Sequence, residues 1–143
     1  MAVNKLLCCI LLALPLRHLT VTSGFGFRTH PVTGQYAFHA GIDLRAHADT
    51  VFAVTGGCVS AGYNHFLGNY IRISSGKLQI IYGHLSQIFV LSSDSVITAQ
   101  ALAISGRTGR VTGEHLHLAV SWRGRYINPL TFLLYAMQHI NQQ

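Results

Sequence analysis

Acidic residues are scarce in this chain of 143 residues, which has four of them against ten lysines and arginines. The formal net charge is +6 at pH 7, and the basic residues are spread along the sequence without a long run of like charge. This balance favours anionic surroundings, such as nucleic acid, acidic lipid or a cell-wall polymer, without choosing among them. Half of the residues are hydrophobic, which excludes a disordered chain and predicts one compact domain with a single core.

Cysteine is also rare, with three residues in the whole chain. Cys8 and Cys9 lie in an apolar run near the N-terminus, so Cys58 is alone in the body of the sequence. A single cysteine cannot form an internal disulfide, and the body must therefore fold without one. Cys58 stands between glycine and valine, and we expect it to be a small buried residue.

Long hydrophobic runs are absent except for residues 6–14, which follow Lys5 and stop at Pro15. This run is about half of the ~20 apolar residues that a membrane-spanning helix needs. We interpret residues 1–19 as a signal peptide, and we expect residues 20–143 to form the exported domain, in the periplasm or cell envelope. The cleavage point is not defined by the sequence. There are two alternatives. Residues 1–19 could be an uncleaved leader, which would then be the domain's sole contact with a membrane, or the start codon could be misassigned.

Short β-rich runs punctuated by glycine dominate the sequence after residue 20. The predicted strands are 51–54, 58–61, 69–74, 77–82, 96–104 and 115–122. Ser75-Gly76 is typical of a tight hairpin turn between the third and fourth of them. A helix is predicted at the C-terminus, where Asn128 can cap and Pro129 can occupy the first turn. The fold class is therefore mainly β, a folded antiparallel sheet with a short C-terminal helix.

Histidine is abundant, with nine residues, and two short motifs contain the most informative ones. In the strand predicted from residue 115, side chains alternate between faces, so His115 and His117 project from the same face. In the segment HAGID, His39 precedes Asp43 by four residues. Imidazole and carboxylate together suit Zn²⁺, and a catalytic zinc takes three protein ligands. One of these four residues would then be left over, in position to accept a proton from water.

Each motif is weak alone, and a third element strengthens them. His84, in the segment IIYGHLS, is predicted to close an apolar strand just before a polar turn, where functional side chains commonly lie. Glu114 adjoins His115 but faces the other side of the strand, so we exclude it. Residues 107–112 contain two arginines and are expected either to cover the cleft, where they would meet substrate carboxylates, or to form a solvated turn.

The ordered motifs HAGID, YGHLS, SGRTGRVTGEHLH and NPLTFL resemble the M23 metallopeptidases, the LytM or lysostaphin-type peptidoglycan endopeptidases. The resemblance extends over residues 20–133 and includes the opening segment SGFGFRTHPVTG. It implies a barrel-sandwich-like LytM domain, with an open groove along a folded antiparallel sheet and zinc near its middle. Leu118 and Ala119 depart from the family, which often has an aromatic residue and a glutamate after HLH.

Carried over residue by residue, the resemblance implies that His39, Asp43 and His117 hold Zn²⁺ while His84 and His115 stand beside it unligated. His115 is then the expected base, and His84 would hydrogen-bond the water or the oxyanion. The sequence allows the roles of His115 and His84 to be exchanged.

The resemblance further implies a zinc-dependent endopeptidase that hydrolyses peptide bonds in peptidoglycan stem or cross-bridge peptides. A further hypothesis is that this domain opens the wall locally for an envelope-spanning secretion or conjugation apparatus. The alternative is a catalytically weak LytM-like regulator of other wall hydrolases, against which the five intact chemical residues argue. Nucleic acid is not an expected partner, because the sequence lacks the interleaved aromatic and basic residues of a stacking surface.

Overall fold

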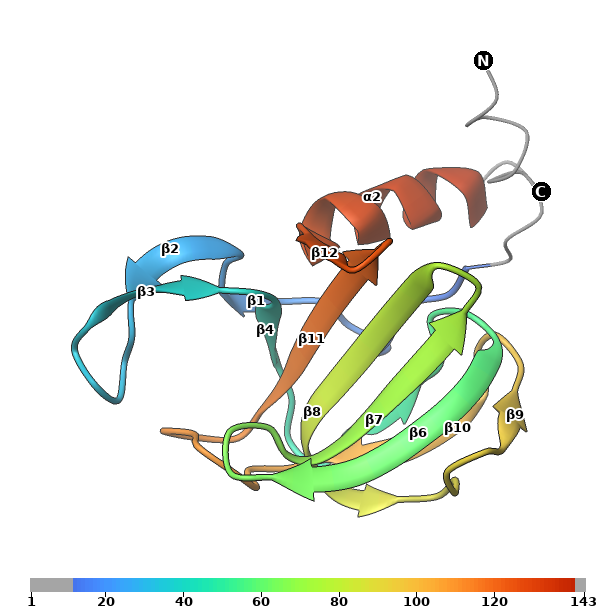
Figure 1. Cartoon of the computed structure of the whole chain (residues 1–143), viewed down its shortest axis with the longest axis horizontal. Helices are drawn as coiled ribbons and strands as arrows, with labels where there is room; N and C mark the ends of the chain where they lie inside the picture. The colour runs from blue at the N-terminus through green and yellow to red at the C-terminus, as the bar shows by residue number, and fades with distance from the viewer. Residues whose placement is uncertain (1–11, 141–143) are drawn as a thin grey trace.

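A computed structural model describes residues 12–140 and consists mainly of β-strands (Figure 1). The strands are β1 (Val21–Ser23), β2 (Gly26–Thr29), β3 (Tyr36–His39), β4 (Ile42–Arg45), β5 (Thr50–Phe52), β6 (Gly57–Asn64), β7 (Gly68–Ser75), β8 (Leu78–Ile88), β9 (Ser95–Val96), β10 (Ala101–Ser105), β11 (His115–Trp122) and β12 (Arg125–Ile127). The helix α2 (Pro129–Ile140) follows them. Its first turn is capped as predicted, because the Leu130 backbone N–H donates to the Asn128 side-chain oxygen.

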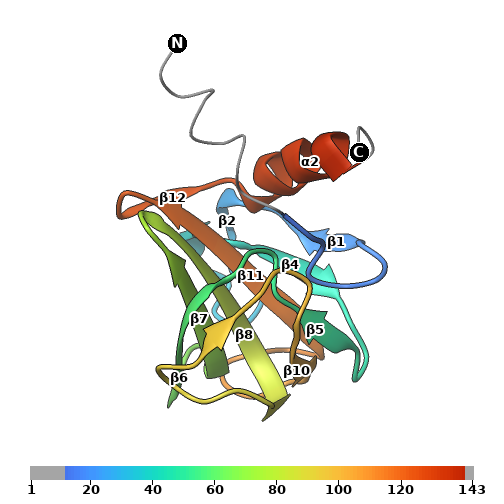
Figure 2. The same cartoon turned by 90° about the vertical axis from the view of Figure 1, so that its right-hand side faces the viewer.

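Every strand pairing is antiparallel, which confirms the predicted sheet. The large sheet has the order β1-β4-β11-β8-β7-β6-β9; β10 pairs with β5 and β8, and β12 pairs with β11. Figure 2 shows α2 lying at one end of this curled sheet. In β11, Leu116, Leu118 and Val120 are fully buried, so the opposite face presents His115 and His117.

The strands β2 and β3 form a separate two-stranded sheet. Figure 1 shows it projecting from the large sheet beside β4 and β11. We call residues 24–39 the arch. Its outer side carries Phe27, Tyr36 and Phe38, whose rings contact one another and are 48–74% exposed. These aromatic pairs across the two strands stabilise a hairpin that has little buried core of its own.

Some sequence boundaries are wrong. The predicted strand 96–104 is two strands, β9 and β10, separated by a turn at Ala99, whose φ is 66°. The hairpin loop between β7 and β8 is Gly76-Lys77, one residue later than expected, and Gly76 adopts a φ of 58°. The expectation that Cys58 is buried is also wrong: it is a free, exposed cysteine, because its neighbour Val59 takes the inward position on β6.

Residues 12–19 lie against the large sheet. The Phe52 N–H donates to the Pro15 carbonyl, the Ala13 N–H donates to the Val54 carbonyl, and Leu16 is 2% exposed within the core. The predicted leader falls partly outside the described residues, and its boundary at residue 20 stays a prediction. Within residues 12–140, no helix is both long and apolar enough to cross a membrane.

Candidate active site

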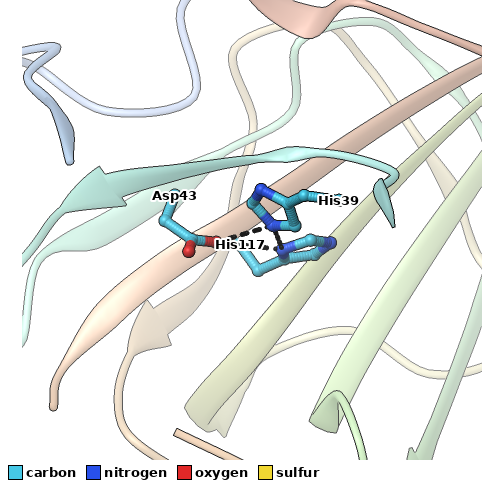
Figure 3. A group of neighbouring side chains, drawn as sticks. All are labelled: His39, Asp43 and His117. Atoms are coloured by element: carbon cyan, nitrogen blue, oxygen red, sulfur yellow. Dashed lines mark hydrogen bonds and ion pairs between the residues drawn. The ribbon is translucent and has the colours of Figure 1, made fainter. Parts of the chain in front are cut away.

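The three predicted metal ligands come together from three strands. His39 ends β3, Asp43 lies in β4, and His117 lies in β11 directly opposite Asp43 in the antiparallel register. His39 and Asp43 do not share a strand; the chain bends between them at Ala40 and Gly41, and this bend brings the His39 ring back over the sheet. Figure 3 shows the Asp43 carboxylate pointing at a ring nitrogen of each histidine.

The ligand atoms fit a tetrahedral ion. His39 Nε2 lies 3.2 Å from His117 Nδ1 and 3.3 Å from Asp43 Oδ1. His117 Nδ1 lies 3.1 Å from Asp43 Oδ1. Nitrogen and oxygen ligands about 2.0–2.2 Å from a tetrahedral zinc are separated from one another by about 3.3–3.6 Å, slightly more than these distances. His39 Nδ1 lies 2.8 Å from the Gly24 carbonyl, which accepts its proton and leaves a lone pair on Nε2. The donor set and its spacing therefore fit Zn²⁺.

Electrostatics favour the ionised form of Asp43 and the neutral form of His117, which are the forms that a metal requires. Burial disfavours the charged form of Asp43, but the imidazoles of His117 and His39 beside it outweigh this effect and hold the pKa of the carboxyl below its usual range. Burial also lowers the pKa of His117, against the raising effect of Asp43. A carboxylate beside a neutral imidazole, as at Asp43 and His117, is a ligand combination that binds a divalent cation.

The other two predicted residues stand beside this group. The ring centroids of His84 and His115 are 4.7 Å apart, and His115 Nε2 lies 3.6 Å from Asp43 Oδ1. His84 Nδ1 lies 2.8 Å from the Thr108 carbonyl, and His115 Nδ1 lies 2.9 Å from the Gly113 carbonyl. Since a carbonyl only accepts, the neutral form of each ring carries its proton on Nδ1 and a lone pair on Nε2. Burial lowers the pKa of His84 to about 4.

His84 does not close its strand as the sequence predicted, because β8 continues to Ile88. The residue lies at an irregularity in the pairing of β8 with β7, and its φ is 62°. A left-handed conformation is uncommon for a residue other than glycine and occurs often at functional sites. The His84 N–H donates to the Leu67 carbonyl, which secures this bulge. The local distortion, rather than a strand end, positions the ring over the site.

Gly41 is required where the arch joins the sheet. A Cβ atom at this position would lie 2.5 Å from the Leu118 carbonyl oxygen and 2.7 Å from His117 Cε1. The bend after His39 therefore passes closer to β11 than any side chain permits. This close approach is what brings His39 within reach of His117.

A groove with a volume of about 530 Å³ surrounds the five residues. The arch forms one wall, and Phe66, Leu67 and residues 110–112 contribute the other. Arg110 and Thr112 of the predicted covering loop line the groove, whereas Arg107 does not. Arg28, which was not among the predicted site residues, lines the groove from the arch. Its alternation with Phe27 in β2 is the signal that places it on the inner face.

Glu114 is turned away from the site, as predicted. Its carboxylate accepts a hydrogen bond from the Ala48 N–H and lies 3.7 Å from His47 Nδ1. His30 lines the groove, but its Nδ1 accepts hydrogen bonds from the backbone N–H groups of Val32 and Thr33. Neither residue joins the ligand group.

Comparison with known proteins identifies the family. The model of peptidase family M23 matches residues 37–129, which contain all five site residues. The chain belongs to peptidase family M23. It is 41% identical over 106 residues to the peptidoglycan DD-endopeptidase ShyA of Vibrio cholerae, a match covering 72% of this chain and 25% of that protein. The chain spans about a quarter of the length of this relative and of other curated relatives that it matches.

Solved structures agree with this family membership. A zinc-containing peptidase from Vibrio cholerae superimposes with a TM-score of 0.71 at 35% identity, covering 76% of this chain and 35% of that one. The catalytic domain of lysostaphin from Staphylococcus simulans gives a TM-score of 0.70 at 26% identity, covering 80% of this chain and 92% of that one. The expected LytM-type fold is thus confirmed.

Proposed function

We propose that this M23 domain is a zinc-dependent endopeptidase that cuts peptide bonds in the stem or cross-bridge peptides of peptidoglycan. The spacing of His39 Nε2, Asp43 Oδ1 and His117 Nδ1, with two further imidazoles facing the same point, supports it most directly. The relative ShyA is named as a peptidoglycan DD-endopeptidase, which supports the substrate class.

In this proposal, His39, Asp43 and His117 hold the metal. Bound Zn²⁺ supplies a Lewis acid that activates water near neutral pH and polarises a peptide carbonyl. The groove orients the extended peptide against the β11 face. The neighbouring imidazoles of His84 and His115 accept and donate protons there. Each of these residues lies in the cavity, so each can reach the same substrate.

His115 is the proposed proton acceptor, through its Nε2 lone pair, and it returns the proton to the leaving amine. His84 Nε2 faces the same site, and as a neutral ring it too can accept a hydrogen bond from water. The predicted role of His84 as a hydrogen-bond donor to an oxyanion requires a proton on Nε2 as well. The ring would therefore have to be positively charged for that role, because its Nδ1 proton is bound to the Thr108 carbonyl. The bonds to Gly113 and Thr108 fix the orientation of both rings.

We further propose that the protein is exported to the periplasm or cell envelope, where peptidoglycan lies, and opens the wall locally for an envelope-spanning secretion or conjugation apparatus. The apolar run at residues 6–14 supports export. N-terminal sequencing of the exported protein checks the leader boundary. A deletion strain that divides normally but is defective in transfer would support the apparatus, and the reverse phenotype would exclude it.

The deciding experiment is digestion of purified peptidoglycan by the zinc-loaded protein, with product masses read by mass spectrometry. We expect metal-dependent release of peptide fragments, and the product masses identify the bond. His117→Ala and chelated protein should release none, while His47→Ala, which changes an exposed histidine outside the groove, should digest normally. Stoichiometric zinc with walls of several cross-link types left intact would favour a regulator of other hydrolases instead.

A further inference from the structure

Two arginines face the groove and are not used by the chemistry proposed above. Arg28 projects from β2 of the arch, and Arg110 lies in the loop before β11. Slight burial lowers the pKa of His30, and the positive charges of Arg110 and Arg28 lower it further. The two cations therefore approach the same part of the groove from different walls.

Arg28 has unused hydrogen-bonding capacity. Its Nη2 lies 3.7 Å from Asp43 Oδ2, beyond the range of a hydrogen bond, and its Nε is buried without a partner. The side chain is 23% exposed and lines the groove. A buried donor without a partner is unfavourable, and turning the guanidinium toward an acceptor bound in the groove would relieve this cost.

Arg110 has no acidic partner among the described residues. Its guanidinium carbon lies 5.8 Å from the centroid of the Phe66 ring, which orients it by a cation–π contact. Three of the four acidic residues of the chain, Asp49, Asp94 and Glu114, accept hydrogen bonds from backbone N–H groups outside the groove. Asp43 is the one acid that lines the groove, and its Oδ1 faces the histidines.

A groove with this imbalance favours an anionic peptide. Guanidinium groups match carboxylates in geometry and bind them through charge-assisted hydrogen bonds. Bound zinc would add positive charge and would neutralise Asp43, leaving both arginines to the substrate. We propose that Arg28 and Arg110 each bind a carboxylate of the peptide, so that the groove selects peptides with free carboxylates close to the cleaved bond. This inference rests on the proposed endopeptidase function.

The test compares two synthetic cross-linked peptides that differ in amidation of the carboxylates flanking the cleaved bond. We expect amidation to lower kcat/KM of the zinc-loaded wild type by about 10–100-fold, chiefly through KM. Arg110→Gln should cut the free and amidated peptides at more nearly equal rates. Arg107→Gln removes the same charge from the same loop outside the groove and should keep the full discrimination. Arg28→Lys should preserve more discrimination than Arg28→Gln.

Equal cleavage of the two peptides by the wild type would overturn this inference while leaving the endopeptidase in place. If Arg28→Gln slowed both peptides by the same factor, Arg28 would act through Asp43 alone, and its part of the proposal would be overturned. Calorimetric binding of both peptides to zinc-loaded His115→Ala protein gives the comparison without turnover. Equal Kd values there would also overturn it. Failure to cut either peptide or whole peptidoglycan would count against the endopeptidase itself.

Discussion

The large sheet and the arch supply the site in different ways. Asp43, His84, His115 and His117 belong to strands of the large sheet, whose inward side chains are fully buried aliphatic residues. His39 and Arg28 belong to a two-stranded hairpin whose aromatic rings are exposed. A two-stranded hairpin is marginal alone, whereas a sheet with a packed core is stable. The sheet therefore holds its residues in place before metal binds, and the arch depends on the contacts of its inner face.

Those contacts converge on a few atoms. His39 Nε2 approaches Asp43 and His117, Arg28 approaches Asp43, and Gly41 allows the bend to touch β11. A metal bound by His39, Asp43 and His117 would tie the arch to the sheet. Metal binding and the shape of the groove are then coupled through one side chain of the arch.

The largest effect is expected from removal of a ligand on either side. His39→Ala, in the arch, and His117→Ala, in the sheet, should each lose stoichiometric zinc and bring peptidase activity below detection, because two protein ligands remain. Metal content by atomic emission and digestion of peptidoglycan check both. His47→Ala is the matched control and should retain zinc and activity. Either ligand variant with full zinc and near-normal turnover would refute the proposed ligand set.

A second prediction concerns the sheet alone. His115→Ala should lower kcat by about 10²–10⁴-fold with zinc retained, because it removes a proton acceptor and no ligand. His84→Gln should retain zinc as well and lower kcat, because His84 lines the same groove and is not one of the three ligands. The measurement is the zinc content and the kcat of each variant. Loss of zinc from His115→Ala would instead make this residue part of the ligand set.

The junction of arch and sheet gives a third prediction. Gly41→Ala should lower the free energy of unfolding by about 1–3 kcal/mol, because its methyl group would overlap the Leu118 carbonyl and the His117 ring. It should weaken zinc binding as well, since His39 follows the bend. Gly24→Ala is the control, because a Cβ there meets nothing within 4 Å. Denaturant unfolding of both variants is the measurement. Equal free energies of unfolding for Gly41→Ala and Gly24→Ala would show that the backbone at the junction shifts to accommodate the methyl group without cost.

The same contrast explains what could be predicted from the sequence. Strand β11 and its two histidines follow from alternation, and the capped helix follows from Asn128 and Pro129, because these signals are local. The strands around the arch are three or four residues long and carry too little periodicity to be recognised. The φ of His84 depends on the pairing of β8 with its neighbours, and the gathering of five site residues could be expected only through the family resemblance.

The smallest structural effect is expected from metal removal, which abolishes activity but should loosen the fold only locally. Chelation should speed amide hydrogen exchange in residues 24–39 while leaving β8 and β11 protected, because zinc ties the arch to a sheet that is already packed. Hydrogen-exchange mass spectrometry of the zinc-loaded and chelated protein makes the comparison within one molecule. His39→Ala should exchange at the chelated rate in either condition. A uniform rise across arch and sheet would mean that zinc stabilises the whole domain, and that the arch has no separate dependence on it.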